Sequence, residues 1–487
     1  MMHLQTRSSE EIRSFYTLND GLPQKAECSG TACFVASKSM GIPLPHKGSG
    51  HERIYCLGKC FSAPASTEDS SVPRIANFSR KSVLVEPLMK HPYESLDQYT
   101  SESGMSGLKA ALSMDQDSVI SEVEKSGLRG RGGAGFPTGI KWRSVAKEKA
   151  GKKYVVMNGD EGDPGSYIDR FLMEYNPYAL IESMIICGYA VGASVGYAYI
   201  RAEYPEAIRK FVSAAREMAS AGFLGRDVLG SGFQFDLEVV QGKGSYICGE
   251  ETALMRSIEG LRPEVSVRPP YPTEKGLFEN PTVIDNVETL ANIPWIIRNG
   301  HQAYSELGYG KSRGTKLLSL NSLFVNPGIY EVEFGTPLET IFYEIGGGMK
   351  HGSIKGVMLG GPLSGIMVPD EFKTRLDYEE IRKAGASLGH GGIIAFDEAT
   401  GIGDLLEHVA TFAADESCGK CTPCRLGTAE LSRMFRKDSG SSLDYARFER
   451  DVESLATGSL CGLGTGMAEF ARSAKIKFSE EVKSCFM

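Results

Sequence analysis

Four cysteines in the C-terminal part of the chain have the spacing of iron–sulfur ligands. The stretch ESCGKCTPCRLGT gives a C-x2-C-x2-C run, and a fourth cysteine follows in SLCGLGTG. Three thiolates on one tight turn can hold three corners of a cubane, and a remote thiolate closes it. A four-cysteine zinc site is the alternative, although zinc usually takes two separated C-x2-C pairs. The spacing favours a [4Fe–4S] cluster on Cys418, Cys421, Cys424 and Cys461.

A second group of four cysteines lies near the N-terminus. CSGTAC and CLGKC give a C-x4-C and a C-x3-C pair, which suit a [2Fe–2S] rhomb, with zinc or a redox dithiol as alternatives. In a chain with a cytosolic composition, 11 cysteines point to metal or redox chemistry before disulfides. We predict a [2Fe–2S] centre on Cys28, Cys33, Cys56 and Cys60. Two core residues and a free thiol account for the others, Cys187, Cys248 and Cys485.

A glycine-rich loop, SGLRGRGGAGFPTGIKWRS at residues 126–144, carries only positive charges in a chain of net charge -8. Glycines let backbone N–H groups close around a phosphate, and we expect the basic side chains to complete the field. They are Arg129, Arg131, Lys141 and Arg143. The loop contains G-x-G-x-x-G, but no clear strand precedes it, so a Rossmann fingerprint is not supported, and a Walker A motif fails on spacing. A glycine-rich surface turn is the plain alternative.

Two more stretches supply acceptors for a nucleotide. VVMNGDEGDPGSYIDR (155–170) packs three carboxylates just after an apolar strand, where they can accept hydrogen bonds from ribityl or ribose hydroxyls. They are Asp160, Glu161 and Asp163. GKGSYICGEETALMRSIEG (242–260) places Glu250 and Glu251 where a helix begins, so a helix cap is the alternative for at least one of them. Together the three loops predict a site for a flavin or nicotinamide nucleotide.

The composition limits the class of protein. A pI of 5.7 argues against a nucleic-acid partner. Residues 1–20 have no apolar core of a signal peptide, so we expect a cytoplasmic protein. The most apolar stretch, residues 179–200, holds Glu182 and many small residues, and we interpret it as a buried helix that runs into a strand rather than a membrane span.

The elements that must position these loops change along the chain. Strands such as KYVVMNGD, GYAYIRA and FDLEVVQ alternate with helical runs up to about residue 312, which is typical of an α/β layer. Short strands with Gly and Pro turns follow to residue 400, and the last part is helical. SAPASTEDSSVPR (62–74) has the composition of a linker after the first cysteine group.

These motifs, with VRPPYPTEKGLFENPTVIDNVETLANIP (267–294) and SLGHGGIIAFDE (387–398), resemble the NADH-binding flavoprotein subunit of respiratory complex I and its relatives in soluble NAD-linked hydrogenases and formate dehydrogenases. The resemblance covers about residues 120–487, and residues 28–65 resemble a shortened thioredoxin-like [2Fe–2S] ferredoxin. It implies a multidomain α/β protein. The expected parts are a thioredoxin-like segment (1–75), a linker and helix (76–120), an FMN- and NADH-binding α/β domain (121–312), a β-grasp-like domain (313–400) and a helical [4Fe–4S] domain (401–487).

The resemblance also implies the site residues. FMN would be bound by Gly130, Gly132, Gly133, Lys141, Asn158, Asp160, Tyr246, Gly249, Glu250 and Asn286. The pocket for the nicotinamide nucleotide would be lined by Phe136, Asp163, Glu251, Arg268 and Tyr271. Glu161 is also expected to bind a cofactor. The sequence departs from the common pattern at DEGDPG, Asp285 and Tyr271, without losing a donor. No side chain is expected to act as acid, base or nucleophile, because the flavin performs the chemistry.

The implied function is that of a diaphorase module. Hydride would pass between NAD(H) and FMN, and single electrons between FMN and the clusters, to or from an iron–sulfur subunit and a catalytic partner such as a formate dehydrogenase or hydrogenase. An electron-bifurcating flavoprotein and a scaffold without nicotinamide activity are the alternatives. Nothing in the order of the motifs requires the N-terminal cysteines to touch the flavin, so we expect a chain starting near Val72 to fold without them.

Overall fold

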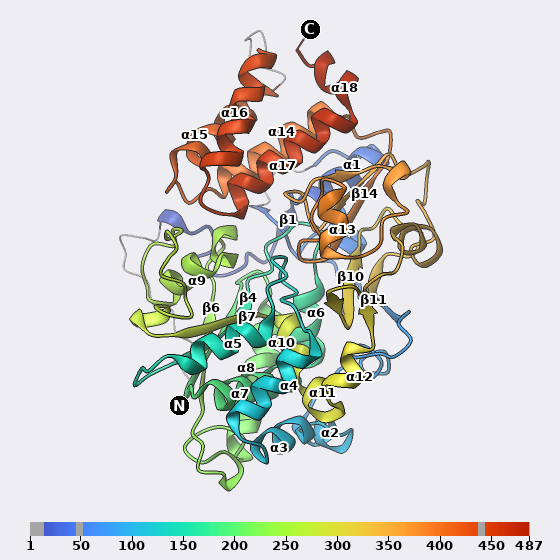
Figure 1. The fold of residues 1–487 in the computed structure, drawn as a ribbon. Helices are drawn as coiled ribbons and strands as arrows, with labels where there is room; N and C mark the ends of the chain where they lie inside the picture. The colour runs from blue at the N-terminus through green and yellow to red at the C-terminus, as the bar shows by residue number, and fades with distance from the viewer. Residues whose placement is uncertain (1–13, 45–51, 437–443, 487) are drawn as a thin grey trace.

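The computed structural model describes residues 14–44, 52–436 and 444–486. Figure 1 shows an elongated molecule, with a helical bundle at the C-terminal end, a parallel α/β layer at the opposite end and a mixed sheet between them. One continuous buried core runs through the N-terminal segment, the α/β layer and the bundle. The mixed sheet has a second core of its own.

The α/β layer is built on a four-stranded parallel sheet with the order β6-β5-β4-β7. Its strands are β4 (Tyr154–Gly159), β5 (Val195–Ile200), β6 (Asp236–Gln241) and β7 (Thr282–Asn286). The predicted strands KYVVMNGD, GYAYIRA and FDLEVVQ are β4, β5 and β6, so these predictions are confirmed. Because β4 and β7 pair in parallel with Asn158 opposite Asn286, the polar residues at their carboxyl ends lie side by side.

Helices surround this sheet. They are α2 (Leu96–Ser101), α3 (Ser106–Leu112), α4 (Gln116–Ser126), α5 (Thr138–Lys147), α6 (Ile168–Tyr175), α7 (Pro177–Val191), α8 (Pro205–Ser220), α9 (Glu251–Ile258), α10 (Val287–Ala291), α11 (Ile293–Asn299) and α12 (His301–Ser305). The apolar stretch 179–200 is the buried helix α7 followed by β5, as predicted. Its Glu182 accepts the N–H groups of Met105 and Leu108 at 3.0 and 2.8 Å. Within the described residues, no helix combines the length and apolarity needed to cross a bilayer.

The mixed sheet has the order β13-β12-β14-β10-β11-β3. Its strands are β3 (Arg74–Asn77), β10 (Thr315–Leu320), β11 (Gly328–Glu333), β12 (Gly356–Leu359), β13 (Ile366–Met367) and β14 (Gly392–Phe396), with α13 (Tyr378–Lys383) against them and the hairpin β8 (Gly308–Tyr309) and β9 (Ser312–Arg313) beside them. The strand β3 lies at the boundary between the predicted linker 62–74 and the segment 76–120, and the sequence analysis did not predict it. Four residues are too few to show the alternation of a strand in the sequence. They become a strand because they pair in parallel with the edge of β11.

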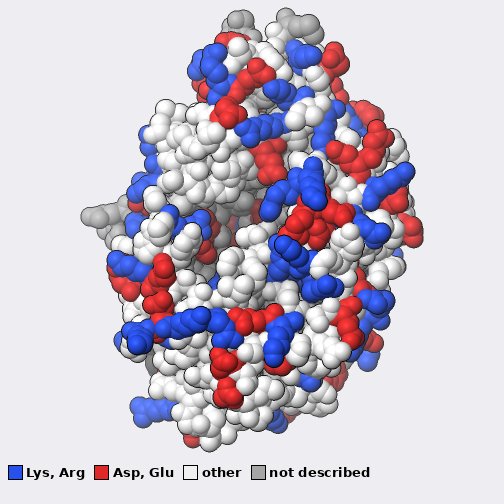
Figure 2. Space-filling model, viewed as in Figure 1, with Lys and Arg blue, Asp and Glu red and all other residues white. Residues whose placement is uncertain are grey.

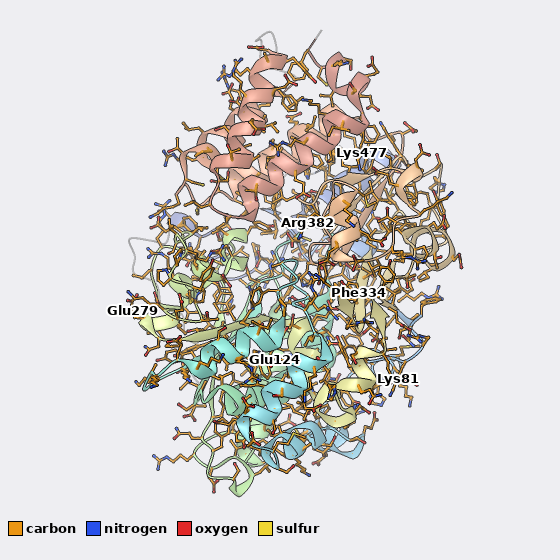
Figure 3. All side chains as sticks on the ribbon, viewed as in Figure 1. Lys81, Glu124, Glu279, Phe334, Arg382 and Lys477 are labelled. Atoms are coloured by element: carbon orange, nitrogen blue, oxygen red, sulfur yellow. The ribbon has the colours of Figure 1, made fainter. Side chains whose placement is uncertain are left out.

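The C-terminal part is helical, as predicted. It consists of α14 (Ile402–Asp415), α15 (Thr422–Met434), α16 (Tyr445–Gly458), α17 (Gly462–Lys477) and α18 (Ser479–Ser484). Lys477, labelled in Figure 3, pairs with Glu371 and ties the end of α17 to the mixed-sheet domain.

The N-terminal segment is a small β-α-β unit in which β1 (Ala26–Cys28) pairs in parallel with β2 (Glu52–Ile54) across α1 (Thr31–Met40). It is packed into the rest of the chain. Arg201 Nη2 donates to the Tyr55 carbonyl at 3.1 Å, and the Ser322 N–H donates to the Cys60 carbonyl at 2.9 Å. The segment therefore contacts both sheets directly.

Candidate functional site

A cavity of about 420 Å³ lies where the glycine loop, the carboxyl ends of the parallel sheet and the helical bundle meet. Figure 2 shows this face of the molecule hollowed between the bundle and the α/β layer. Most of the predicted cofactor residues line the cavity: Gly130, Gly132, Phe136, Lys141, Asn158, Asp160, Glu161, Asp163, Tyr246, Gly249, Glu250, Glu251, Arg268 and Asn286. Gly133 and Tyr271 lie outside the lining. Residues from distant parts of the sequence are thus brought into one cavity.

Glycines shape two walls of this cavity. A Cβ atom at Gly132 would lie 3.1 Å from the Cβ of Asn286, and one at Gly249 would lie 3.2 Å from the Asp160 carbonyl oxygen. Gly133 has a φ of 116° and packs against Gly389. Because side chains there would crowd the opposite wall, the sequence leaves room for a ligand to approach the backbone.

The backbone N–H groups of the loop are free for such a ligand. The Arg131 N–H donates to Thr289 Oγ at 2.8 Å, but within the described part of the chain the N–H groups of residues 132–135 have no protein acceptor. A row of free backbone donors at a glycine turn is an anion-binding arrangement. The arrangement suits a phosphate, and phosphate binding by this loop stays a prediction.

The arginine side chains of the loop do not point toward the free N–H groups of residues 132–135, contrary to the prediction. The three arginines are turned away from the cavity, and their guanidinium groups bond to Glu379, Tyr304 and Glu124 respectively. Glu124 lies on α4 and is labelled in Figure 3. Lys141 lines the cavity but donates to the Ile284 carbonyl at 2.6 Å and to Asp285 at 2.9 Å. The prediction that Arg129, Arg131 and Arg143 complete the phosphate field is wrong, because a loop with little side-chain volume needs them to fix it to its surroundings.

Two carboxylate oxygens in the cavity lack hydrogen-bond partners. Asp160 Oδ2 and Glu250 Oε1 are buried and accept no hydrogen bond from the described residues, although Arg268 Nη2 lies 3.7 Å from Glu250 Oε1. Burial raises the pKa of Asp160 well above its usual range. Glu250 uses its other oxygen to accept the N–H groups of Thr252 and Ala253, so the helix-cap alternative is confirmed for that oxygen. Unpartnered buried acceptors are costly unless a ligand supplies donors, and the hydroxyls of a ribityl or ribose chain would do so.

The outer part of the cavity carries a charged pair. Arg268 donates to Glu251 and lies 3.7 Å from Glu250, while Tyr246 Oη donates to Asp163 at 2.6 Å. Phe136 is 50% exposed and belongs to the lining. This part of the cavity is acidic and has an aromatic side chain exposed at its wall.

Glu161 lines the cavity, but its carboxylate is already engaged. It accepts the N–H groups of Ile168, Asp169 and Arg170 at 2.7, 3.0 and 3.0 Å, at the start of α6. Its contact with a cofactor stays a prediction, whereas its role in fixing the turn before α6 follows from these bonds.

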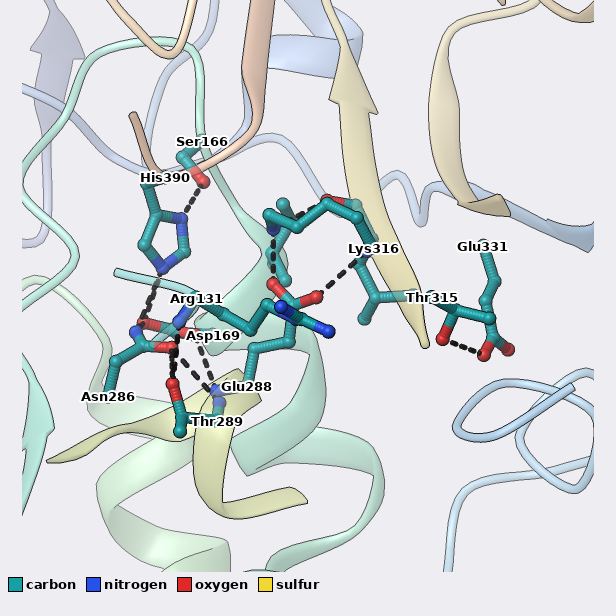
Figure 4. A network of polar contacts seen from close by, with 12 residues as sticks. Arg131, Ser166, Asp169, Asn286, Glu288, Thr289, Thr315, Lys316, Glu331 and His390 are labelled. Atoms are coloured by element: carbon teal, nitrogen blue, oxygen red, sulfur yellow. Dashed lines mark hydrogen bonds and ion pairs between the residues drawn. The ribbon is translucent and has the colours of Figure 1, made fainter. Parts of the chain in front are cut away.

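Three polar residues that sequence reasoning missed complete the inner end of the cavity, namely Asp169, Thr289 and His390. Figure 4 shows the network that joins them. His390 Nε2 lies 2.8 Å from Asp169 Oδ2 and 3.0 Å from Asn286 Nδ2, and Nδ1 lies 2.7 Å from Ser166 Oγ. His390 lies in the stretch SLGHGGIIAFDE that carries the family resemblance, but nothing in the sequence assigns it to the cavity, which it enters from a loop of the mixed-sheet domain.

The C-terminal cysteines converge beside the cavity. Cys418 and Cys424 are buried, and Cys421 and Cys461 are partly exposed at the N-terminal ends of α15 and α17. Burial raises the pKa of the Cys424 thiol to about 12 and that of Cys461 to about 11. Thiolates form in such a place only with a compensating cation, which iron provides. Cys461 also lines the cavity, so the cysteine centre and the flavin-sized space share a wall.

The N-terminal cysteines are also brought together. All four are buried, and Cys56 Sγ lies 3.5 Å from Cys60 Sγ. A Cβ atom on Gly30 would lie 3.5 Å from Cys28 Sγ and 3.4 Å from the Cβ of Cys56, so these two residues flank the same glycine. A Cβ atom on Gly30 would lie 3.3 Å from Pro164, in the loop that carries Asp160 and Asp163. The group thus lies against the back of a cavity wall, which the order of the motifs did not reveal.

Comparisons with known proteins agree with this geometry. Residues 123–295 match the Nuo51 FMN-binding domain, and residues 404–485 match the NADH-ubiquinone oxidoreductase-F iron-sulfur binding region. The chain is 41% identical over 424 residues to the NADP-reducing hydrogenase subunit HndC of Solidesulfovibrio fructosivorans, covering 86% of this chain and 85% of the relative. It is 38% identical over 418 residues to the NADH-quinone oxidoreductase F subunit of Aquifex aeolicus (strain VF5), covering 84% and 96%. A solved NAD+-reducing [NiFe]-hydrogenase in the H2-reduced state superposes with a TM-score of 0.82 at 27% identity, covering 98% of this chain and 87% of that one.

Proposed function

The chain belongs to the family of NADH-quinone oxidoreductase F subunits and related hydrogenase flavoprotein subunits, and from this membership we propose how its own residues serve the reaction. It is an NADH dehydrogenase module that uses FMN and a [4Fe–4S] cluster. The observation that carries the proposal is the single cavity lined both by the nucleotide loops and by Cys461. Bound FMN accepts a two-electron hydride from NADH and passes electrons on singly.

The chain contributes the binding of the flavin. The free N–H groups of residues 132–135 hold the phosphate, and the narrow approach between Gly132 and Asn286 admits it. Asp160 Oδ2 and Glu250 Oε1 accept from the ribityl hydroxyls, which gives these two buried oxygens the donors that they lack. These contacts fix the flavin against the wall that contains Cys461.

The nicotinamide nucleotide enters from the outer part of the cavity. The half-exposed ring of Phe136 offers a face on which the nucleotide can stack. The Tyr271 side chain is also exposed and is available to the adenine end of the nucleotide. Asp163 and Glu251 make this part acidic, which disfavours the additional phosphate of NADPH. Arg268 is already paired with Glu251, so we propose that NADH is the preferred nucleotide.

We propose a [2Fe–2S] centre on Cys28, Cys33, Cys56 and Cys60. Four buried cysteines without disulfides, two of which have their sulfur atoms 3.5 Å apart, are a suitable ligand set for a two-iron rhomb. Zinc on the same thiols is the alternative, and iron and acid-labile sulfide analysis distinguishes the two.

Electrons reach a separate chain through the C-terminal centre. Figure 2 shows a broad area without charged side chains over the end of the bundle where α15 and α17 begin. Leu426 and Leu460 are exposed there, next to the partly exposed Cys421 and Cys461. We propose that an iron–sulfur subunit covers this face, within a cytoplasmic complex that includes a catalytic subunit such as a hydrogenase or formate dehydrogenase.

The proposed function is tested with the Cys424→Ser variant. The anaerobic wild type should contain one FMN per chain, NADH should bleach the flavin, and electrons should pass to an iron–sulfur acceptor protein. In Cys424→Ser the flavin should still bleach while transfer to the acceptor protein is lost, because Cys424 holds the cluster and not the flavin. Cys485→Ser, near the C-terminus, is the control and should behave as wild type. Loss of flavin bleaching in Cys424→Ser would contradict a role confined to electron transfer.

A further inference from the structure

His390 lines the cavity, and the binding roles described above do not explain its presence there. His390 is buried and lies in the loop before β14. It contacts Asn286 at the end of β7, as Figure 4 shows, and Glu161 in the loop after β4. The arginine side chains of the glycine loop are turned outward. Lys141 also lines the cavity, but its ammonium group donates to Asp285 and to the Ile284 carbonyl. A phosphate held beside the free N–H groups of the glycine loop would meet His390.

The geometry around the ring shows that both ring nitrogens donate. The Ser166 hydroxyl donates to Glu161 Oε1 at 2.6 Å, so its oxygen accepts from His390 Nδ1. Nε2 lies 2.8 Å from Asp169 Oδ2 and 3.0 Å from Asn286 Nδ2. The Asn286 amide donates to the same Asp169 oxygen at 2.6 Å, so Nε2 donates to Asp169 rather than accepting from Asn286. An imidazole that donates from both nitrogens carries a positive charge.

A metal ion is a poor explanation of the same three residues. Glu161, Asp169 and His390 offer atoms within 4.8 Å of one another. However, each carboxylate faces a different nitrogen of the ring, at 3.3 Å for Glu161 and 2.8 Å for Asp169. One ion cannot bind both nitrogens of one ring, and Glu161 already accepts three backbone N–H groups. The arrangement is a charged imidazolium between two carboxylates.

We propose that His390 is a positioning residue for the FMN phosphate, supplying the positive charge that lets a dianion bind beside Glu161 and Asp169. The inference rests on the proposed function, because it requires that the cavity holds FMN. The phosphate belongs at this end because the glycine loop reaches it: a Cβ atom on Gly132 would lie 3.1 Å from the Cβ of Asn286, and Gly133 packs against Gly389, the residue before His390. Without the imidazolium, two buried carboxylates would repel the phosphate at short range.

The charge of His390 depends on pH. Burial lowers the pKa of His390, but Asp169 and Glu161 outweigh burial and raise it to about 9. Lys316, on β10, opposes the charge and is itself paired with Glu288, while Asp163 faces the ring from the loop after β4. The folded-state pKa is higher than the usual 6.5, so the charge is fully present near pH 6.5 and is lost as the pH rises through about 9.

The test compares FMN with riboflavin, which lacks the phosphate and shares every other group. Dissociation constants of both are measured by fluorescence titration of the flavin-depleted full chain. His390→Gln should lower the preference for FMN over riboflavin about tenfold to hundredfold at pH 7, the range expected for a hydrogen bond to a charged group. His301→Gln, a histidine paired with Glu122 away from the cavity, is the matched control and should leave the preference unchanged.

The pH profile provides a second measurement that needs no variant. In the wild type, the preference for FMN over riboflavin should fall between pH 7.5 and 9.5. Titration of carboxylates that contact the ribityl chain affects the dissociation constants of both flavins and therefore cancels in their ratio. An equal loss of affinity for FMN and riboflavin in His390→Gln, or a flat wild-type profile, would overturn the proposal. Failure of the wild type to bind either flavin would instead reject the proposed function, so the two failures are distinguishable.

Discussion

Replacing Lys316 by methionine tests the buried ion pair that joins the mixed sheet to the parallel-sheet domain. Lys316 on β10 donates to Glu288 on α10, and neither side chain is exposed. Glu288 also accepts the Leu317 N–H at 2.9 Å, so it is held by groups of the mixed sheet on two sides. The pair appears in Figure 4, next to the His390 network.

Methionine keeps most of the side-chain volume but leaves the Glu288 carboxylate buried without its cation. Breaking a buried pair by removing one partner costs about 3–5 kcal/mol. We therefore expect Lys316→Met to lower the free energy of unfolding by about this amount. Lys316→Met/Glu288→Gln should recover part of the loss, because the remaining buried group is then neutral.

The measurement is urea unfolding of the flavin-loaded chain followed by tryptophan fluorescence. The chain has 2 tryptophans. Trp142 and Trp295 lie buried in α5 and α11 of the same domain, so the signal reports its unfolding. Lys210→Met is the matched control: Lys210 pairs with Glu94, whose side chain is 63% exposed, and exposed pairs contribute about 0–1 kcal/mol. If Lys316→Met lowers the free energy of unfolding by less than about 1 kcal/mol, as the control does, the buried pair does not stabilise the contact between the two domains.

Four further outcomes are expected. Gly132→Ala should weaken FMN binding about tenfold or more, since overpacking of this kind costs about 1–3 kcal/mol, whereas Gly151→Ala, where a Cβ meets open space, should have no effect on FMN titrations. Glu251→Gln should raise kcat/KM for NADPH relative to NADH, because Arg268 loses its charged partner; equal use of both nucleotides by the wild type would contradict the argument. Deletion of residues 1–71 should lower the thermal midpoint and the flavin content, contrary to the sequence-based expectation, because the segment packs on Pro164 and Tyr204; an unchanged midpoint would restore that expectation. The free energy of unfolding of the apoprotein should decrease as the pH rises from about 6.5 through about 9, because His390 loses its charge, and His390→Gln should flatten this slope in pH-dependent urea titrations.

The sequence predicts those parts of the site that depend on local spacing. The cysteines of ESCGKCTPCRLGT converge because a turn and a helix start bring them together, and Asn158 and Asn286 meet because both end parallel strands. The glycine loop is placed correctly for the same reason, since its donors are backbone groups of consecutive residues.

The sequence fails where a contact joins residues far apart in the chain. The direction of Arg131 is set by Tyr304, and His390 reaches Asp169 across 221 positions. Neither side chain differs by type or spacing from one that points into solvent or core, so only the packed fold determines its partner. The strand β3 is likewise defined by an edge of β11 and not by its own four residues.

The docking of the N-terminal segment also constrains the biosynthesis of the protein. Lys38 and Cys60 are synthesised before Asp404 and Ser322, so the contacts of Lys38 with Asp404 and of the Cys60 carbonyl with Ser322 form only later. At about 5–20 residues per second, the interval between synthesis of Cys60 and of Asp404 is about 20–70 s. During that time the four N-terminal thiols lack their final enclosure and are accessible to oxidants or to an iron–sulfur donor. The enclosure of these thiols is therefore a late event that follows the synthesis of the flavin domain around them.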